Sequence, residues 1–312
     1  NTIQSGINNS NNADTIIVAP GVYTDTISFN GKGIVLASNY IYTQDPLDIV
    51  STIIDGNNMG TVVRFDNGED STSCLLGFTI QNGYGTGANN GGGGIYIAGY
   101  SYAGVSCSPR LSDLIIQNNY GYWGGGMYIA DQASPTCHNI IIKNNSANNM
   151  GGGIFIDNSQ PLFEYSVIAN NSPSGVYIGH WSGTCCTGNI SSFYNCTFFE
   201  NSINYGYPSN EGPYTGVLKI HNSVVYGNNS SSYINGSYPD IEINFSNIKG
   251  GFSGTGNIDQ DPLFTDDAMD DFSLQSNSPC IDAGDPNPIY NDPDGTINDM
   301  GAFYYYQNIL TT

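Results

Sequence analysis

The chain has 312 residues, and its six lysines and arginines against 27 aspartates and glutamates give a formal net charge of −21. This balance excludes nucleic acids and anionic membranes as partners, because phosphate binding requires clustered cations. An acidic polysaccharide would also be repelled, unless a divalent cation such as calcium bridges the two surfaces. Only 11% of the residues are charged. Polarity comes instead from Asn, Ser, Thr, Gly and Tyr, which suits a β-rich extracellular protein.

The seven cysteines exceed what a reduced cytosolic protein usually carries, and Cys185 and Cys186 are adjacent. We therefore predict a secreted protein with some disulfides. The alternative is that several cysteines are small buried core residues. No run of about 18 apolar residues predicts a membrane span. We interpret the start at Asn1, without an apolar leader, as a mature, processed form.

Residues 1–12 contain Ile3 and Ile7 four positions apart, the spacing of one or two amphipathic helical turns. From Asp14 onward, short apolar strands alternate with turns such as Pro20-Gly21. Strands without helical spacers cannot form a βαβ sheet, but they can stack in parallel as the coils of a β-helix. The first coil of such a solenoid must be covered. We therefore predict a helical N-terminal cap over 1–12 and a parallel β-helix over 13–275.

The repeat is clearest in the middle of the chain, where Ile116, Ile142 and Ile168 lie 26 residues apart. This period predicts coils of about 26 residues. Six strand residues align on this column: Ile80, Ile116, Ile142, Ile168, Phe199 and Tyr226. Side chains two positions along a strand point the same way. We therefore expect asparagine side chains two positions later to point inward and to form a ladder of hydrogen bonds from coil to coil. These residues are Asn82, Asn118, Asn144, Asn170, Asn201 and Asn228.

Glycine runs mark a second recurring corner, at 91–94, 124–126 and 151–153. They predict close approach of the backbones of neighbouring coils. The repeat spacing is interrupted near 179–192 and 203–216. We expect these segments to be projecting loops, which often form the binding surfaces of solenoid proteins. Residues 276–312 are predicted to close the last coil.

The segment TIIDGNNMGTVVRFDNGED followed by GFTIQNG, the GGGIYI-type strands, and the ending DPLFTDDAMDDFSLQSNSPCIDAGDP resemble secreted bacterial proteins of the pectin-lyase-like class. The resemblance covers nearly the whole chain and implies an all-β, right-handed parallel β-helix. The alternation of Gly-rich strands and Asn corners is also similar to polymorphic outer-membrane adhesin repeats. The pectin-lyase-like class includes polysaccharide lyases, glycoside hydrolases, adhesins and phage tailspikes, so the fold does not fix an activity.

Candidate catalytic residues follow the second strand of each repeat, where alignment of Ile129, Ile156 and Ile178 brings three residues to one edge of the solenoid: Asp131, Asp157 and His180. Coils stack at about 4.8 Å, which would place the two carboxylates within the distance used by retaining glycosidases. The alternative is that these residues make Asx turns. The six cations are scattered, and Lys143 is expected on the surface, so no base for a lyase stands out.

Aromatic residues near the same edge are candidates for stacking on sugar rings: Tyr120, Tyr122, Trp123 and Trp181. A third candidate site is the run from Asp292 through Asp294 to Asp299, which resembles the start of a calcium loop. It lacks the terminal Glu and the helices of an EF-hand. Structural calcium and a metal-free turn that closes the last coil are the two interpretations.

These features favour a secreted, cell-surface solenoid that acts by binding or assembly, whether adhesive, glycan-binding or filament-forming. Its partners would be a polysaccharide, a surface glycan or copies of itself. The alternative is a polysaccharide lyase or glycoside hydrolase. The shortage of cations and of a convincing acid–base pair favours the non-enzymatic interpretation.

Overall fold

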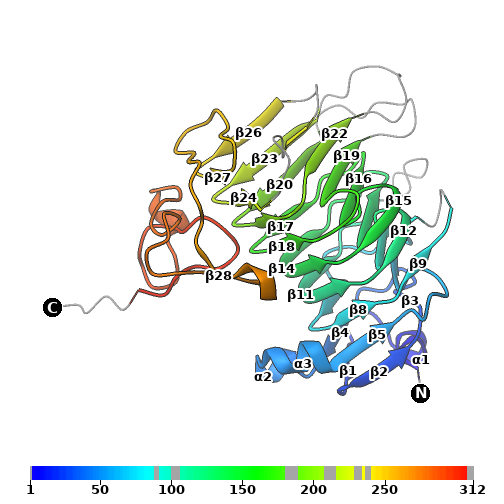
Figure 1. The fold of residues 1–312 in the computed structure, drawn as a ribbon. Helices are drawn as coiled ribbons and strands as arrows, with labels where there is room; N and C mark the ends of the chain where they lie inside the picture. The colour runs from blue at the N-terminus through cyan, green and yellow to red at the C-terminus, as the bar shows by residue number, and fades with distance from the viewer. Residues whose placement is uncertain are drawn as a thin grey trace.

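The computed structural model describes residues 2–87, 91–99, 106–179, 189–206, 216–227, 234–235 and 240–307. The chain winds into a parallel β-helix whose strands stack along one axis, from the blue N-terminal coil to the yellow last coil (Figure 1). Each complete coil contributes a strand to three long faces. None of the helices in the described residues has the length and apolar character of a membrane span.

Faces 1 and 2 belong to one sheet, which has 16 strands within the described residues, because β11 and β14 run through both faces. Face 1 contains β1 (Thr15–Val18), β4 (Val35–Ser38), β7 (Cys74–Leu76), β11 (Arg110–Gln117), β14 (Thr136–Lys143), β17 (Leu162–Glu164), β20 (Ile190–Tyr194), β23 (Val217–His221) and β26 (Asp240–Asn244). Face 2 contains β2 (Gly21–Thr24), β5 (Thr52–Asp55), β8 (Thr79–Gln81), the second halves of β11 and β14, β18 (Val167–Ala169), β21 (Thr197–Phe199), β24 (Val224–Tyr226) and β27 (Asn247–Ile248).

Face 3 and a short fourth sheet complete the coils. Face 3 contains β3 (Ile27–Ser28), β6 (Val63–Phe65), β10 (Ile95–Ala98), β13 (Met127–Ala130), β16 (Ile154–Asp157), β19 (Val176–Gly179), β22 (Ile203–Gly206) and β25 (Ile234–Asn235). The short sheet lies between faces 2 and 3 and contains β9 (Tyr84–Gly85), β12 (Tyr120–Trp123) and β15 (Ser146–Met150). The predicted loop at 203–216 therefore begins with a strand, and most of both predicted loops lies outside the described residues.

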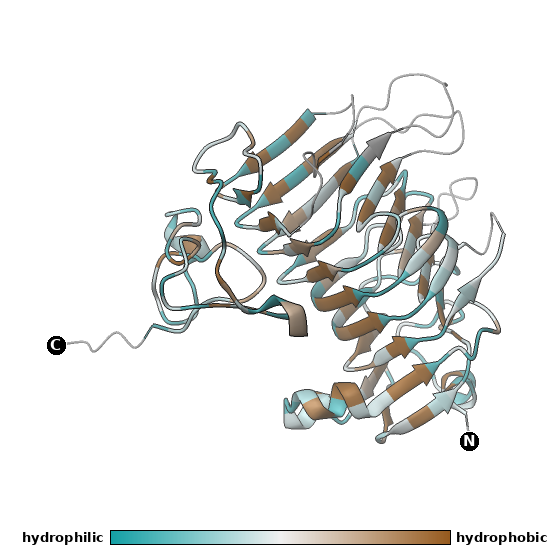
Figure 2. Cartoon of the chain, in the orientation of Figure 1, coloured by the Kyte–Doolittle hydropathy of each residue, from teal (hydrophilic) through white to brown (hydrophobic). Residues whose placement is uncertain are grey.

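The core fills the interior of the solenoid with one side chain from every second strand position. Ile116 pairs with Ile80 and Ile142, and Ile142 pairs with Ile168, so the predicted 26-residue column is confirmed. All four side chains are fully buried in the main apolar cluster. Figure 2 shows hydrophobic residues concentrated in the stacked strands and hydrophilic residues in the connecting turns.

The asparagine ladder exists, but its register differs from the prediction by one residue. Asn118, like its counterparts in three other coils, adopts a left-handed φ of 55° at the corner. Asn118 and Asn144 are exposed, and Asn82 and Asn170 are partly exposed. This left-handed bend turns the next residue inward. The buried ladder therefore consists of Asn119, Asn145, Asn171 and Asn201, in which the Nδ2 of each residue donates a hydrogen bond of 3.0 Å to the Oδ1 of the next. The predicted members Asn82, Asn118, Asn144 and Asn170 are wrong, Asn201 is right, and Asn228 lies outside the described residues.

The glycine corner packs directly against this ladder, as predicted for a close backbone approach. A Cβ added at Gly126 would lie 2.7 Å from the carbonyl oxygen of Gly153 and 3.0 Å from Nδ2 of Asn145. The first contact is shorter than real Cβ atoms show, and the second is tighter than most real Cβ contacts. The glycines thus let the amide column and the adjacent coil occupy the same corner.

The N-terminal cap is helix α1 (Ile3–Asn9), which buries Ile3 and Ile7 over the first coil as predicted. Two further helices were not predicted: α2 (Tyr40–Thr43) follows β4 and packs on it, and α3 (Pro46–Ser51) lies against face 2. The Asp45 side chain caps α3, and Pro46 follows at its first position. This is a standard helix start signal, so the sequence did carry a sign of the helix.

The C-terminal segment, residues 258–307, folds back over face 2 (Figure 1). It contains the antiparallel pair β28 (Phe264–Asp266) and β29 (Asp271–Leu274) and the 3-10 turns η2 (Asp267–Met269) and η3 (Pro288–Tyr290). Its Phe272 ring lies 5.1 Å from that of Phe199 on β21, and Lys143 pairs with Asp270 at 2.8 Å. Lys143 thus anchors this segment to face 2. The last parallel strand, β27, ends at Ile248, whereas the predicted β-helix extends to residue 275.

The described cysteines are structural. Cys74, Cys107, Cys137, Cys196 and Cys280 are all buried and free. The predicted disulfides are therefore wrong for these five, while Cys185 and Cys186 lie outside the described residues. Burial raises the pKa of the Cys196 thiol to about 12, which keeps it protonated and unreactive.

Candidate functional site

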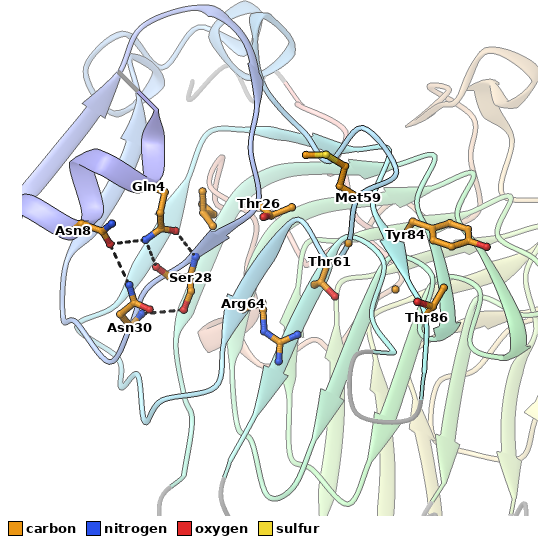
Figure 3. A pocket seen from close by; sticks show the side chains of 13 residues that line it. Gln4, Asn8, Thr26, Ser28, Asn30, Met59, Thr61, Arg64, Tyr84 and Thr86 are labelled. Carbon is orange, nitrogen blue, oxygen red and sulfur yellow. Dashed lines mark hydrogen bonds between the residues drawn. The ribbon is translucent and has the colours of Figure 1, made fainter.

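A groove of about 720 Å³ opens at the N-terminal end of face 3, beside the cap helix (Figure 3). Its walls come from the cap, from two successive coils and from the start of the short sheet. The lining is mostly hydroxyl and amide side chains, with one cation and one aromatic ring. It consists of Gln4, Asn8, Thr26, Ile27, Ser28, Asn30, Met59, Gly60, Thr61, Arg64, Tyr84, Gly85 and Thr86.

The amides at the cap end are held in fixed positions by hydrogen bonds to one another. Gln4 donates through Nε2 to Asn8 Oδ1 at 2.9 Å, and its Oε1 accepts from the backbone of Ser28 at 2.8 Å. Asn30 donates to Asn8 Oδ1 at 3.3 Å (Figure 3). Because these side chains are already ordered, a ligand that binds them loses little of their conformational entropy.

The cation of the groove, Arg64, projects outward from β6 because its neighbours Val63 and Phe65 point into the core. Its Nε donates to Asp66 Oδ2 at 3.0 Å, and its guanidinium lies 4.6 Å from the ring centroid of Tyr96. The side chains of Arg64 and Asp66 are 26% and 23% exposed. The positive charge in the groove is therefore matched by a neighbouring carboxylate.

An aromatic stack borders the groove on the short sheet. The rings of Tyr84 and Tyr120 are 5.0 Å apart and inclined by 18°, and Tyr84 is 42% exposed. Tyr122, on the same strand as Tyr120, is 36% exposed. Tyr120, a predicted sugar-stacking residue, thus contacts a residue of the groove. Sequence reasoning missed Tyr84. The repeat offered the signal, since Gln81-Asn-Gly-Tyr-Gly85 matches Gln117-Asn-Asn-Tyr-Gly121.

The other predicted stacking residues are not at the groove surface. Trp123 is only 3% exposed, and its ring stacks on Phe155 at 5.3 Å. Phe155 belongs to a row of outward rings on face 3 that runs from Tyr96 through Tyr128 and Phe155 to Tyr177. Trp123 therefore supports this row from the side. Trp181 lies outside the described residues.

The predicted catalytic carboxylates lie near this row, but they are not in register with each other. Ile129 pairs with Ile156, so Asp157 follows its paired residue by one position and Asp131 by two. Asp157 is 8% exposed and accepts a hydrogen bond from the Tyr128 hydroxyl at 3.2 Å, whereas Asp131 is exposed in a left-handed turn. His180 lies outside the described residues. A catalytic role for these residues stays a prediction.

Both tyrosines beside these carboxylates have raised pKa values. Burial, and after it the charge of Asp131, raises the pKa of Tyr96 to about 12, although Arg64 acts in the opposite direction. Burial and then Asp157 raise the pKa of Tyr128 further. Both phenols are therefore protonated at neutral pH, and the Tyr128 hydroxyl acts as a hydrogen-bond donor.

The predicted calcium ligands are hydrogen-bond acceptors in a turn of the C-terminal segment. Asp292 Oδ2 accepts from the Asp299 backbone at 2.9 Å, and the two oxygens of Asp299 accept from the backbones of Asp282 and Tyr305. Asp294 accepts from Gln307. Within the described residues no three acidic, histidine or cysteine side chains are grouped to hold a metal ion. The backbone N–H groups that donate to these aspartates are typical of a turn. Calcium binding here stays a prediction.

The two buried carboxyls of this turn both have raised pKa values. Burial, followed by repulsion from Asp299, raises the pKa of Asp292 to about 7, and burial also raises that of Asp299. The turn is therefore held by acceptor groups whose charge is partly suppressed.

Comparison with known proteins identifies the fold of the chain. No family model matches the chain, and no curated protein matches it in sequence. The crystal structure of a pectate lyase matches with a TM-score of 0.50 at 16% identity, over 97% of this chain and 91% of the lyase. A pectin methylesterase in complex with a hexasaccharide matches with a TM-score of 0.47 at 10% identity, over 88% of this chain and 94% of that one. The fold is thus the right-handed parallel β-helix of the pectate lyase, as the sequence resemblance implied.

Proposed function

We propose that this chain binds a neutral polysaccharide in the groove at the N-terminal end of face 3. One observation carries the proposal: the exposed, stacked ring of Tyr84 borders a groove whose other walls are ordered amides and hydroxyls. Sugar recognition needs both elements, since aromatic faces pack on the apolar faces of sugar rings and amides bond the hydroxyls. Pectate lyase, which shares the fold, acts on a polysaccharide by its name.

The charge pattern supports a neutral ligand over a uronate. The chain carries a net charge of −21, and Arg64, the only cation among the groove residues that the structure describes, is paired with Asp66. An anionic chain would meet a negative field without an uncompensated cation to offset it. We place the protein outside the cell in this proposal, where polysaccharides of this kind occur.

The test compares binding to matched ligands by calorimetric titration. Fully methyl-esterified hexagalacturonate is neutral, and xylohexaose is a neutral ligand of a different sugar. Tyr84→Ala should weaken binding of the esterified ligand about tenfold, because an aromatic contact contributes about 0.5–1.5 kcal/mol beyond its buried area.

The matched control is Tyr42→Ala, since Tyr42 is 73% exposed on α2, away from the groove. This variant should bind as the native chain does. Native protein that binds no neutral oligosaccharide, or equal affinities for the Tyr84→Ala and Tyr42→Ala variants, would refute the proposed site.

Cleavage of a polysaccharide is the second candidate function, and the hydrogen bond from Tyr128 to the buried Asp157 favours it. A positioned carboxylate next to a phenol supplies the two kinds of group that general acid–base catalysis uses. Release of reducing or unsaturated ends that disappears in Asp157→Asn would establish cleavage. Polysaccharide that stays intact after prolonged incubation, with and without calcium, would leave binding as the function.

A further inference from the structure

We propose that Asp66 sets the charge selectivity of the groove: it neutralises Arg64, so that the groove accepts uncharged sugars and rejects uronates. This inference rests on the groove being the polysaccharide site. It concerns which polysaccharide the groove takes.

The strand geometry places the two side chains together. Val63 and Phe65 are fully buried, so Arg64 and Asp66 alternate with them on the outer side of face 3. Arg64 uses two guanidinium nitrogens on one oxygen of Asp66, with Nε at 3.0 Å and Nη2 at 2.5 Å. A contact through two donors is stronger and better oriented than a single ion contact.

Asp66 is itself held in place by its neighbour. Its second oxygen, Oδ1, accepts from Nδ2 of Asn67 at 3.0 Å, so both oxygens have donors. Asp66 is absent from the groove lining, whereas Arg64 is part of it. Asp66 thus acts on the ligand through Arg64, as a positioning and charge-balancing residue.

The guanidinium also has a support that does not depend on the charge of Asp66. It lies 4.6 Å from the Tyr96 ring centroid, and Tyr96 is 8% exposed and packs in the row of face 3 rings. A cation above an aromatic face is attracted to it. An asparagine at position 66 would keep an acceptor for Arg64, and the exposed Asn67 amide can turn to accept from the new side chain. Arg64 should therefore stay in place when the carboxylate charge is removed.

The local field agrees with this balance. Near the Tyr96 ring, the carboxylates of Asp131, Asp66 and Asp157 raise the phenol pKa while Arg64 alone lowers it. Removing the negative charge of Asp66 makes the electrostatic potential next to the groove more positive, because the charge of Arg64 is then less compensated. The effect on a bound uronate should be that of one partly exposed ion pair, about twofold to fivefold in affinity.

The experiment measures the affinity ratio between hexagalacturonate and its fully methyl-esterified form, which differ in charge and in the ester methyl groups; the comparison between variants cancels the contribution of the methyl groups. The native chain should prefer the ester. Asp66→Asn should shift the ratio toward the free acid by about twofold to fivefold, and the shift should shrink in high salt because screening weakens it.

Two further variants separate charge from folding. Arg64→Gln leaves Asp66 unbalanced and should shift the ratio in the opposite direction, further toward the ester. The single Asp66→Asn variant is expected to bind hexagalacturonate more tightly relative to its ester. The double variant Asp66→Asn/Arg64→Gln should not show this increase, because the cation that attracts the acid is gone. Tyr42→Ala serves as the control with an unchanged ratio.

The outcomes distinguish this inference from the proposed function. Native protein that binds neither of these ligands, nor xylohexaose, refutes the groove as a polysaccharide site. Native protein that binds the ester, with the same ratio in Asp66→Asn and Arg64→Gln, keeps the groove and overturns the role of Asp66. A gain for the acid that persists in the double variant shows that Arg64 is not its source, which also overturns the inference.

Discussion

The buried asparagine ladder gives the sharpest prediction for stability, and Asn145 is its best test. This side chain is 1% exposed. Its Nδ2 donates to the Ile116 carbonyl at 2.9 Å and to Asn171 Oδ1 at 3.0 Å, and its Oδ1 accepts from both nitrogens of Asn119 at 3.0 Å. The side chain therefore joins three successive coils.

Asn145→Ala leaves the backbone N–H of Asn119 without its partner inside the solenoid. An orphaned buried donor costs about 1–3 kcal/mol, and the loss of the remaining bonds adds about 1 kcal/mol. The variant should lose about 2–4 kcal/mol of unfolding free energy, measured by urea denaturation followed by circular dichroism. This is a large fraction of the stability of a typical domain.

The matched control is the preceding residue. Asn144 is exposed with a φ of 55°, a conformation that glycine adopts without strain. Asn144→Gly should therefore change the unfolding free energy by less than about 0.5 kcal/mol. Equal losses in the two variants, or a loss below about 1 kcal/mol for Asn145→Ala, would show that the ladder does not have the register described above.

The C-terminal segment and His221 give two further predictions. Phe272→Ala should cost about 3–5 kcal/mol, because the ring is 2% exposed, and should make residues 258–307 more sensitive to limited proteolysis; digestion no faster than in Tyr306→Ala, whose ring is 66% exposed, would contradict this. Burial lowers the pKa of His221, although its bond to Asp285 at 3.1 Å opposes the shift. The folded state therefore favours neutral imidazole, and its contribution to stability is fully present above about pH 6.5 and is lost as the pH falls. His221→Asn should flatten this part of the thermal stability profile, and an unchanged profile would refute it.

The sequence was sufficient for the fold because the 26-residue period repeats the same core position in each coil. It was not sufficient for the register of the corner, where strand alternation stops. A left-handed residue such as Asn144 rotates the chain, so the side chain that turns inward is one position later than alternation predicts. Asparagine suits both positions, since it tolerates positive φ and bonds its neighbours. Two adjacent asparagines therefore hid which one was buried.

The groove was beyond the reach of sequence reasoning for a different reason. Its residues come from the cap, from two coils and from the short sheet, between Gln4 and Thr86, and no spacing links them. Tyr120 was predicted as a stacking residue because it belongs to a clear repeat, and its ring lies against Tyr84 of the groove. Trp123 was assigned to the ligand surface because it is aromatic, but strand alternation at the short sheet places it against Phe155.

The most direct test of the central claim is a crystal structure of the chain with methyl-esterified hexagalacturonate. The proposal predicts density for the sugar chain in the groove, with a ring against Tyr84 and hydroxyls within hydrogen-bond distance of the amides near Ser28. An oligosaccharide bound instead beside Asp157, or a groove without sugar at a saturating concentration, would contradict it.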